Sequence, residues 1–161
     1  MIRTATMADL PAVLEVYAYA REYMVQTGNP TQWGKVYPDA ELLTEDIESR
    51  RLFLLEENGV LHGVFYFLIG PDPTYALIEN GSWRSEAPYG TIHRIAAAKG
   101  ARGVFGRCME YCLTQIGHLR IDTHEDNKVM QHTLEKHGFV PRGTIYTDNG
   151  TPRIAYDYLC P

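Results

Sequence analysis

The sequence predicts one α/β domain of the α+β type, with a mixed β-sheet of about six or seven strands flanked by helices. Three observations support this fold class. The chain has 161 residues, a length that suits one compact domain with a core. In its second half, apolar strand-like runs alternate with stretches of helical periodicity. No internal repeat, low-complexity tract or linker divides the chain, so we expect a single domain over residues 1–161.

The composition excludes several classes of protein. No apolar run reaches the length of about 18 residues that a membrane helix needs. The opening stretch, MIRTATMADLP, lacks the long apolar segment of a secretory signal. The net charge is −5 and no basic block is present, so nucleic acid is not an expected partner. We therefore expect a cytoplasmic protein that does not associate with membranes.

The first half of the chain predicts a strand, two helices and a hairpin. The first helix has apolar residues at helical spacing, with Pro11 in its first turn and Gly28 at its end. Asn58-Gly59 is a strong turn signal between two runs that are rich in aromatic and β-branched residues. The predicted ranges are a strand at 2–6, helices at 7–28 and 39–50, and a hairpin at 52–70.

The second half predicts strands that alternate with helices. The stretch 71–90 is rich in proline and glycine, and one short strand at 75–78 is expected within it. Cys108 and Cys112 lie four residues apart on a predicted helix, where we expect them to be small apolar residues of its buried face. The predicted ranges are strands at 89–98 and 118–124, helices at 102–117 and 126–138, and a final hairpin at 139–159.

A glycine-containing loop between a strand and a helix gives the clearest functional signal. Gly100 and Gly103 precede the predicted helix, and the basic residues Lys99 and Arg102 lie beside them. The first N–H groups of a helix lack partners within it, and the helix dipole attracts anions there. Glycine lets a phosphate approach the backbone, so the loop indicates a phosphate cradle, although two glycines would also suit a simple turn. The spacing fits neither an ATPase nor a Rossmann site.

Over nearly its full length, the chain resembles the GNAT N-acetyltransferases. Their pyrophosphate motif is [RQ]-x-x-G-x-[GA] at the start of a helix, and Gly103 matches its central glycine. Gly100 replaces the usual Arg or Gln of that motif, and Phe105 replaces its last small residue. The opening IRTATMADLPAVLEVY is similar to the first strand and helix of the family. The stretch DNKVMQHTLEKHGFVPRGTI is similar to the family block N-x-x-[AM]-x-x-x-[YL]-x-x-x-G-F.

The resemblance implies a GNAT-like fold and an N-acetyltransferase that uses acetyl-CoA as cosubstrate and a small amine as acceptor. In that family two central parallel strands separate, and the pantetheine arm of the coenzyme pairs with their free peptide groups. By position, these strands are residues 91–96 and 119–124. The coenzyme contacts that the resemblance implies are Ile95, Ala96, Ala97, Arg102, Gly103, Val104, Phe105, Gly106 and Asn127.

His93 is the first candidate for acid–base catalysis. It lies two residues before Ile95, so both side chains should share a strand face, and imidazole exchanges protons near neutral pH. A histidine that is hydrogen-bonded inside the sheet would fit this position equally well. The tyrosine that many family members use as the thiol's acid is replaced here by Leu134. Tyr146, Tyr111 or a water molecule could replace that acid, or the thiolate could leave without one, and we name Tyr146 as the candidate.

The acceptor site is predicted from loops and strand ends. Its candidate residues are Trp33, Tyr37, Glu79 and His124. Trp33 and Tyr37 lie in a polar loop, which favours contact with a small amine over burial in the core. Asp122, His124 and Asp126 could instead bind backbone N–H groups or a divalent metal, but their spacing does not favour a metal and none is expected.

Two other functions stay open at this point. A GNAT-like module could bind an acyl-CoA and sense it with little catalysis, which Leu134 and the degenerate glycine motif favour. A nucleotide-binding α/β protein is the weaker alternative. The exposed edges of the predicted hairpins also allow a homodimer.

Overall fold

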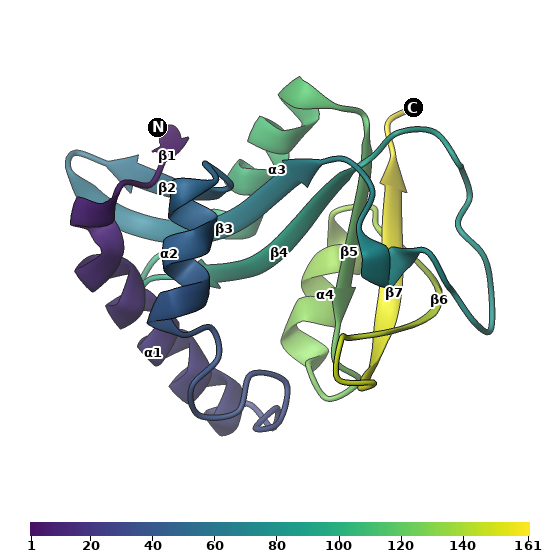
Figure 1. The fold of residues 1–161 in the computed structure, drawn as a ribbon, viewed down its shortest axis with the longest axis horizontal. Coiled ribbons are helices and arrows are strands. Elements are labelled where there is room, and N and C mark those ends of the chain that lie inside the picture. Colours follow the sequence, from purple (N-terminus) through teal and green to yellow (C-terminus); the bar gives the residue numbers. More distant parts are fainter.

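The computed structural model describes residues 1–161 and has the predicted architecture, one mixed sheet with flanking helices (Figure 1). The strands are β1 (Ile2–Thr4), β2 (Leu52–Glu57), β3 (Val60–Ile69), β4 (Gly90–Ala97), β5 (His118–Thr123), β6 (Val140–Tyr146) and β7 (Pro152–Leu159). The helices are α1 (Leu10–Gln26), α2 (Ala40–Glu48), α3 (Val104–Gln115) and α4 (Lys128–Lys136). None of these helices has both the length and the apolar content that crossing a membrane requires.

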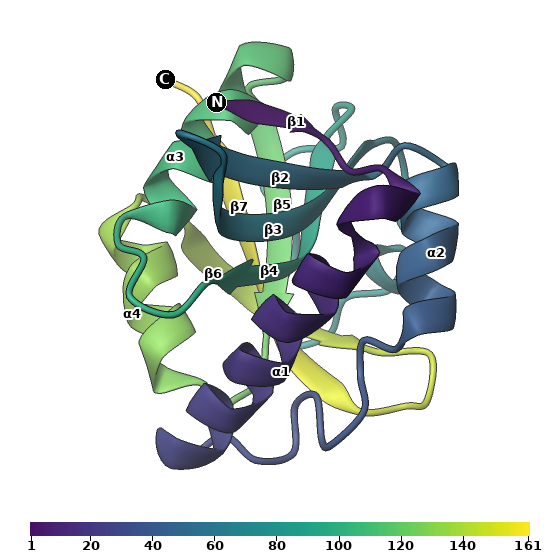
Figure 2. The ribbon, with the colours of Figure 1, turned by 90° about the vertical axis from the view of Figure 1, so that its left-hand side faces the viewer.

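The sheet has seven strands in the order β1-β2-β3-β4-β5-β7-β6. Its neighbours pair in antiparallel fashion except β4 and β5, which are parallel and are connected through α3. Helices α1 and α2 lie on one side of the sheet, and α3 and α4 lie on the other (Figure 2). The fold class predicted from the sequence is therefore confirmed.

The core has two layers because successive side chains of a strand point to opposite faces of the sheet. Leu54 and Val64 face α1 and α2, where they pack with Tyr17. Leu55 and Phe65, their neighbours in the chain, face α3 and α4. Each face of the sheet thus buries its own apolar cluster. The two clusters together hold the middle strands in place.

The α3 helix buries both cysteines, as the sequence predicted. Cys108 and Cys112 are fully buried among the apolar residues under the sheet. Burial raises the pKa of the Cys108 thiol to about 12, so this thiol stays protonated near neutral pH. Gly106 serves close helix packing, because a Cβ atom there would lie 3.0 Å from Nε2 of His137 after α4.

The long connection between β3 and β4 corrects one prediction. The strand expected at residues 75–78 is absent, and Pro73–Tyr75 forms a turn of 3-10 helix instead. The side chain of Asp72 caps this turn by accepting the N–H of Thr74 at 2.9 Å. An Asp-Pro pair favours such a turn, since the ring of proline fixes its φ angle and the carboxylate can bind a nearby N–H. The turn directs the side chain of Tyr75 into the interior.

The same connection is fastened to the far end of the sheet. Asp157 of β7 is fully buried and accepts hydrogen bonds from the Nε atom and the main-chain N–H of Arg84, at 2.7 and 3.1 Å. The indole of Trp83 donates to the carbonyl oxygen of Tyr75 at 3.0 Å. These contacts hold a segment without regular structure in one position, and this segment carries Asp72 and Tyr75 toward the centre of the sheet.

Candidate functional site

The parallel strands β4 and β5 separate soon after they meet. They pair only at Gly90 with Leu119 and at Thr91 with Arg120. Beyond these two pairs the strands diverge, which leaves residues 92–97 of β4 without a partner on that side (Figure 1). The separation of the two strands that the resemblance implied is confirmed, and peptide groups of β4 line the resulting gap.

A β-bulge in β4 shapes one wall of the gap. The register between β3 and β4 shifts between Val64 and Tyr66, and Arg94 has a left-handed φ of 50°. The Tyr17 hydroxyl donates to the carbonyl oxygen of Arg94 at 2.6 Å. Because of the bulge, His93 and Ile95 line the same cavity together with Arg94 between them, whereas a regular strand would turn every second residue away.

Arg94 is held by contacts on several sides. Its Nε and Nη2 atoms lie 3.0 and 2.7 Å from one carboxylate oxygen of Asp46 in α2, and Nη1 donates to the Tyr37 hydroxyl at 3.1 Å. Its guanidinium also covers the ring of Tyr66 at 4.6 Å. Burial opposes the charge, but Tyr37 and Asp46 raise the pKa of Arg94, so it stays cationic. This ion pair fastens the bulge of β4 to α2.

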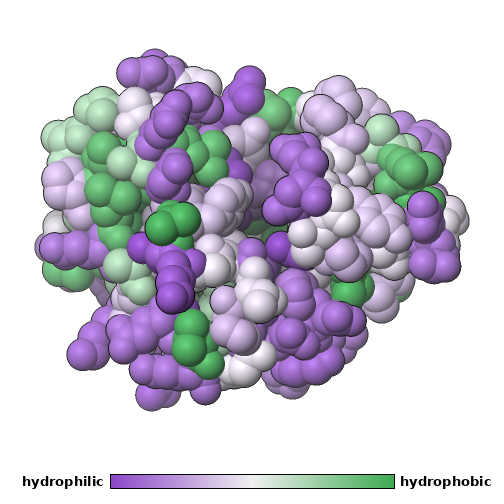
Figure 3. Space-filling model, turned by 60° about the horizontal axis from the view of Figure 1, so that its bottom comes forward, coloured by the Kyte–Doolittle hydropathy of each residue, from purple (hydrophilic) through white to green (hydrophobic).

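The gap widens into a cavity of about 620 Å³. The face toward which it opens is hollowed between two lobes, with mainly hydrophilic residues around the hollow (Figure 3). The aromatic side chains of Trp33, Tyr37 and Tyr66 contribute to its wall. The volume and the mixed lining suit a small molecule with both polar and apolar parts.

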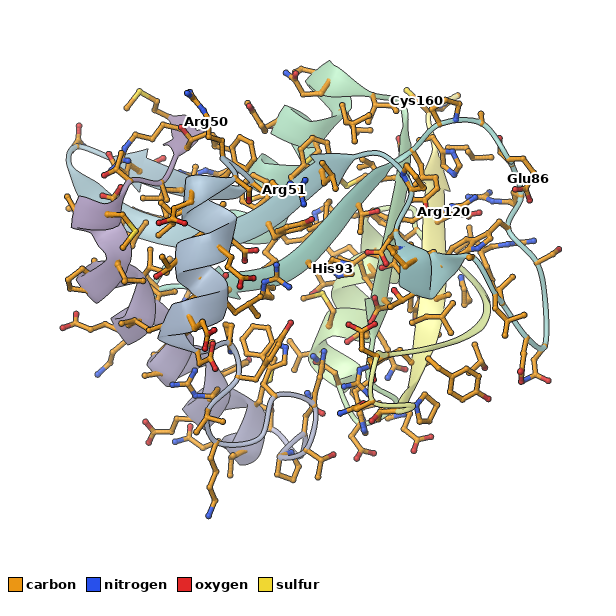
Figure 4. The ribbon with its side chains drawn as sticks, viewed as in Figure 1. Arg50, Arg51, Glu86, His93, Arg120 and Cys160 are labelled. Carbon is orange, nitrogen blue, oxygen red and sulfur yellow. The ribbon has the colours of Figure 1, made fainter.

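His93 lies in this cavity between two carboxylates. Its Nε2 atom is 2.6 Å from Asp72, and its Nδ1 atom is 3.8 Å from Asp122. Asp122 also accepts the hydroxyl of the buried Tyr75 at 2.7 Å. Figure 4 places His93 on β4 beside the gap. Since an ionised carboxylate can only accept, Asp72 favours the tautomer with the proton on Nε2 and leaves Nδ1 as an acceptor toward the cavity.

Asp72 is suited to hold this tautomer. Burial would raise its pKa, but hydrogen bonds from His93 and Thr74 lower the pKa to about 2. The carboxylate is therefore ionised near neutral pH. An ionised acceptor of this kind orients the imidazole and stabilises it when it takes up a proton. The pair can thus transfer protons to and from a molecule in the cavity.

The start of α3 is built differently from the starts of α2 and α4. The first residues of α2 and α4 are capped by the side chains of Asp39 and Asn127, which accept main-chain N–H groups. Gly103 precedes α3 with a left-handed φ of 68°, and no side chain caps this helix. A Cβ atom at Gly100 or Gly103 would meet nothing within 4 Å. The N–H groups of the first turn are thus left without a side-chain cap, next to open space at the two glycines.

The other residues proposed for the coenzyme site have distinct surroundings. The side chains of Val104 and Phe105 are buried in the core, so only their main-chain groups are available. Asn127 lines the cavity, where Oδ1 accepts the N–H of Met130 at 3.0 Å and Nδ2 donates to Gln32 at 2.9 Å. Both ends of its side-chain amide are thus engaged within the protein.

Of the four residues proposed for the acceptor, the structure brings Trp33 and Tyr37 to the cavity, with ring centroids 6.2 Å apart. His124 does not line it, and its Nδ1 atom accepts the N–H of Asp126 at 3.0 Å. Asp122, His124 and Asp126 form no group that could hold a metal ion.

The two tyrosines named as replacement acids lie apart from His93. Tyr146 is exposed, does not line the cavity and donates to Glu79 at 3.2 Å, which places Glu79 outside the cavity as well. The negative charge of Glu79 raises the pKa of Tyr146. Tyr111 packs beside Phe53 on the α3 side of the sheet, with ring centroids 5.5 Å apart. The catalytic role of Tyr146 stays a prediction.

Several cavity residues escaped the sequence analysis. Among them are Gln32, Asp72, Thr74, Thr123 and Arg153. Thr123 ends β5, and its buried hydroxyl has no hydrogen-bond partner in the protein. The Asp-Pro turn signal at Asp72 was visible in the sequence, but nothing there related it to His93.

Comparisons with known proteins agree with this geometry. Neither a family model nor a curated protein sequence matches the chain. A GNAT-family acetyltransferase structure from Streptococcus agalactiae is 28% identical with a TM-score of 0.87, over 100% of this chain and 95% of that one.

Two further structures share the fold at lower identity. A GNAT-family acetyltransferase from Listeria monocytogenes is 18% identical with a TM-score of 0.71, over 99% of this chain and 94% of that one. The structure of yncA from Salmonella typhimurium, solved with its cofactor acetyl-CoA, is 16% identical with a TM-score of 0.61, over 100% of this chain and 94% of that one.

The fold, the separation of β4 from β5 and the glycine before α3 thus agree with the likeness of the whole chain to acetyltransferase structures. Over its whole length the chain has the fold of GNAT-family acetyltransferases, and it is similar in sequence to one of them at 28% identity.

Proposed function

We propose that the chain transfers an acetyl group from acetyl-CoA to the amine of a small molecule. The observation that carries this proposal is the open gap between β4 and β5, which ends beside the uncapped start of α3. One part offers peptide groups to an extended amide-containing arm, and the other offers free N–H groups to a diphosphate. Coenzyme A joins these two chemical features in one molecule.

The residues around the gap fit the coenzyme. Peptide groups at 95–97 of β4 would pair with the pantetheine amides, and the main chain at 102–106 would receive the pyrophosphate. Thr123 also lines the cavity, and its buried hydroxyl has no hydrogen-bond partner in the protein. Unpaired buried polar groups are costly, so a ligand that satisfies them gains affinity. The open space at Gly100 and Gly103 leaves room for the phosphates.

His93 is the group that we assign to proton transfer. The coenzyme supplies a thioester whose acyl carbon the neutral amine attacks, so that a C–N bond forms and the C–S bond breaks. Nδ1 of His93 accepts the proton that the amine loses, while Asp72 holds the ring at 2.6 Å and stabilises its charged form. The cavity walls keep the amine in position, which contributes to the rate as proximity.

The proton for the departing thiolate has a different source from the usual tyrosine. Leu134 is fully buried in the core and has no proton to donate. Tyr146 and Tyr111 do not line the cavity. These positions favour a water molecule as the proton donor, or departure of the thiolate without a donor.

A second function deserves a test because of Leu134. A sensor of acyl-CoA with the GNAT fold would need the coenzyme site, but it would not need a proton donor for the thiol. Such a protein would bind acetyl-CoA and release no thiol with any amine.

Two measurements on the purified chain separate these functions. Calorimetry with acetyl-CoA tests binding, and a colorimetric thiol-release assay over a panel of small amines tests transfer. We expect binding together with thiol release that depends on the amine, and a product heavier by one acetyl group in mass spectrometry. Binding without release from any amine supports the sensor. Absence of binding rejects both functions.

A further inference from the structure

Arg153, the second residue of β7, is a buried cation in the cavity without a carboxylate partner. Arg153 is 9% exposed to solvent. Nη1 donates to the carbonyl oxygen of Pro152 at 3.0 Å, and Nη2 donates to that of Gln32 at 3.2 Å. Both acceptors are neutral, and no carboxylate oxygen lies within 4.0 Å of the guanidinium. The side chain is therefore fixed in place while its charge is left uncompensated.

The other cavity arginine shows the contrast. Arg94 is neutralised by Asp46 at 2.7 Å, whereas Arg153 has no such ion pair. Burial lowers the pKa of Arg153, and the more distant charge of Asp122 acts in the opposite direction. A buried charge without a counter-ion costs free energy, and an anionic ligand group would recover it.

A free carboxylate oxygen lies near this cation. Asp122 on β5 pairs in register with Ala155 on β7, two residues after Arg153. Residues two apart on a strand share a face, so Asp122 and Arg153 are diagonal neighbours across the two strands, roughly 7–8 Å apart at their Cα atoms. Oδ2 of Asp122 accepts the hydroxyl of Tyr75, and Oδ1 has no partner in the protein. The two opposite charges line one cavity and do not pair with each other.

This arrangement is complementary to a molecule that carries both charges. We propose that the acceptor is a free amino acid whose carboxylate binds Arg153 and whose amino group binds near Asp122 and His93. The inference rests on the proposed acetyl transfer and adds the class of acceptor. The planar guanidinium offers paired N–H groups that match a carboxylate. Asp122 receives the ammonium form on binding, and His93 is 3.8 Å from it, ready to accept a proton.

The rest of the cavity indicates which amino acids to test first. Trp33, Tyr37 and Tyr66 form an aromatic wall, which favours apolar or aromatic side chains. Suitable probes are therefore phenylalanine, tyrosine, leucine and methionine. Each has a matched amine that lacks only the carboxylate: 2-phenylethylamine, tyramine, 3-methylbutylamine and 3-(methylthio)propylamine.

The test compares each amino acid with its matched amine in the thiol-release assay. In the wild-type chain we expect kcat/KM for at least one amino acid to exceed that of its amine by about tenfold or more. Arg153→Gln should lower kcat/KM for the amino acid about tenfold to a hundredfold more than for the amine, as expected for a lost charged hydrogen bond. Arg153→Lys should keep part of the preference.

The control variant is Arg50→Gln. Arg50 is exposed at the end of α2, away from His93 in Figure 4. This variant removes one positive charge outside the cavity and should leave the preference for amino acids unchanged. Equal efficiency with amino acid and amine in the wild type would overturn the inference. So would an Arg153→Gln variant that loses both activities to the same extent, since Arg153 would then be structural.

A binding measurement separates this inference from the proposed function. The chain loaded with coenzyme A, which carries no acetyl group, is titrated with each amino acid and each amine in a calorimeter. Amino-acid binding that Arg153→Gln abolishes, without thiol release in the assay above, would contradict acetyl transfer and support an amino-acid site at Arg153. Thiol release from amines alone, with no amino acid bound, would support acetyl transfer and overturn the acceptor class.

Discussion

The two ends of the gap between β4 and β5 are built from different parts of the chain. Toward α3, the wall is main chain: the unpaired peptide groups of β4 and the helix start at Gly103. Toward the β6–β7 hairpin, the wall is a network of side chains centred on His93 and Asp72. We propose that the first end binds groups that every coenzyme A molecule carries. The second end can change with single substitutions, and we infer that it selects the acceptor and moves protons.

The strongest test of this difference between the two ends is a variant that loses turnover and keeps its affinity for the coenzyme. His93→Ala removes the proton acceptor and leaves the main-chain end intact. We expect kcat to fall about a hundredfold to ten-thousandfold, the usual contribution of a general base, while the dissociation constant of acetyl-CoA stays nearly the same. Steady-state kinetics and calorimetry measure the two quantities. Equal losses in both would make His93 a structural residue.

The opposite change, at the main-chain end, is Gly103→Asp. The carboxylate would repel the diphosphate, so we expect the affinity for acetyl-CoA to fall by about a hundredfold or more. Gly103→Asn is the matched control, because asparagine has the same shape without the charge and tolerates the left-handed φ of 68°. Calorimetry on both variants isolates the effect of charge. Unchanged affinity in the aspartate variant would reject the assignment of this loop to the pyrophosphate.

The link between Asp72 and His93 gives a prediction with a pH dependence. Asp72→Asn should lower kcat about tenfold or more, because the amide no longer selects one tautomer of the ring. The pKa of Asp72 is lowered to about 2, so folding favours its ionised form. The resulting stabilisation, about 2 kcal/mol at most, is complete above about pH 4 and is lost as the pH falls toward 2.

Urea unfolding of the wild type and the Asp72→Asn variant from pH 6 down to pH 3 measures the stabilisation that ionised Asp72 contributes. The difference between their free energies of unfolding should shrink as the pH falls. A difference that stays constant over this range would contradict an ionised Asp72 paired with His93. A kcat that does not change would remove Asp72 from the proton-transfer assignment.

The sequence predicted the main-chain end better than the side-chain end, for a physical reason. A helix start that binds a ligand through its N–H groups needs glycines next to it, and Gly100 and Gly103 can be recognised directly in the sequence. The bulge at Arg94 has a left-handed φ of 50° without a glycine, because Tyr17 and Asp46 hold it from other elements. Nothing in the local sequence indicates it.

The side-chain network depends on contacts between distant parts of the chain. Asp72 lies 21 residues before His93, and Tyr75 lies 47 residues before Asp122. Their approach follows from the fastening of the β3–β4 connection to Asp157, which no spacing rule describes. His93 was found because it lies on the strand that leads into the glycine loop. Asp72 and Arg153, on other elements, were missed.

The smallest expected effect concerns Thr123, the last residue of β5, which lines the cavity. Its buried hydroxyl has no partner in the protein, so Thr123→Val removes no hydrogen bond from the free chain. We expect the free energy of unfolding to stay the same or rise slightly, because a group with unmet hydrogen-bonding capacity is replaced by a methyl group of similar size. Affinity for acetyl-CoA should fall about twofold to tenfold, the value of one hydrogen bond. Thermal unfolding and calorimetry measure both changes. A less stable variant with unaltered affinity would mean that the hydroxyl serves the fold, and the gap would then receive the coenzyme through its main chain alone.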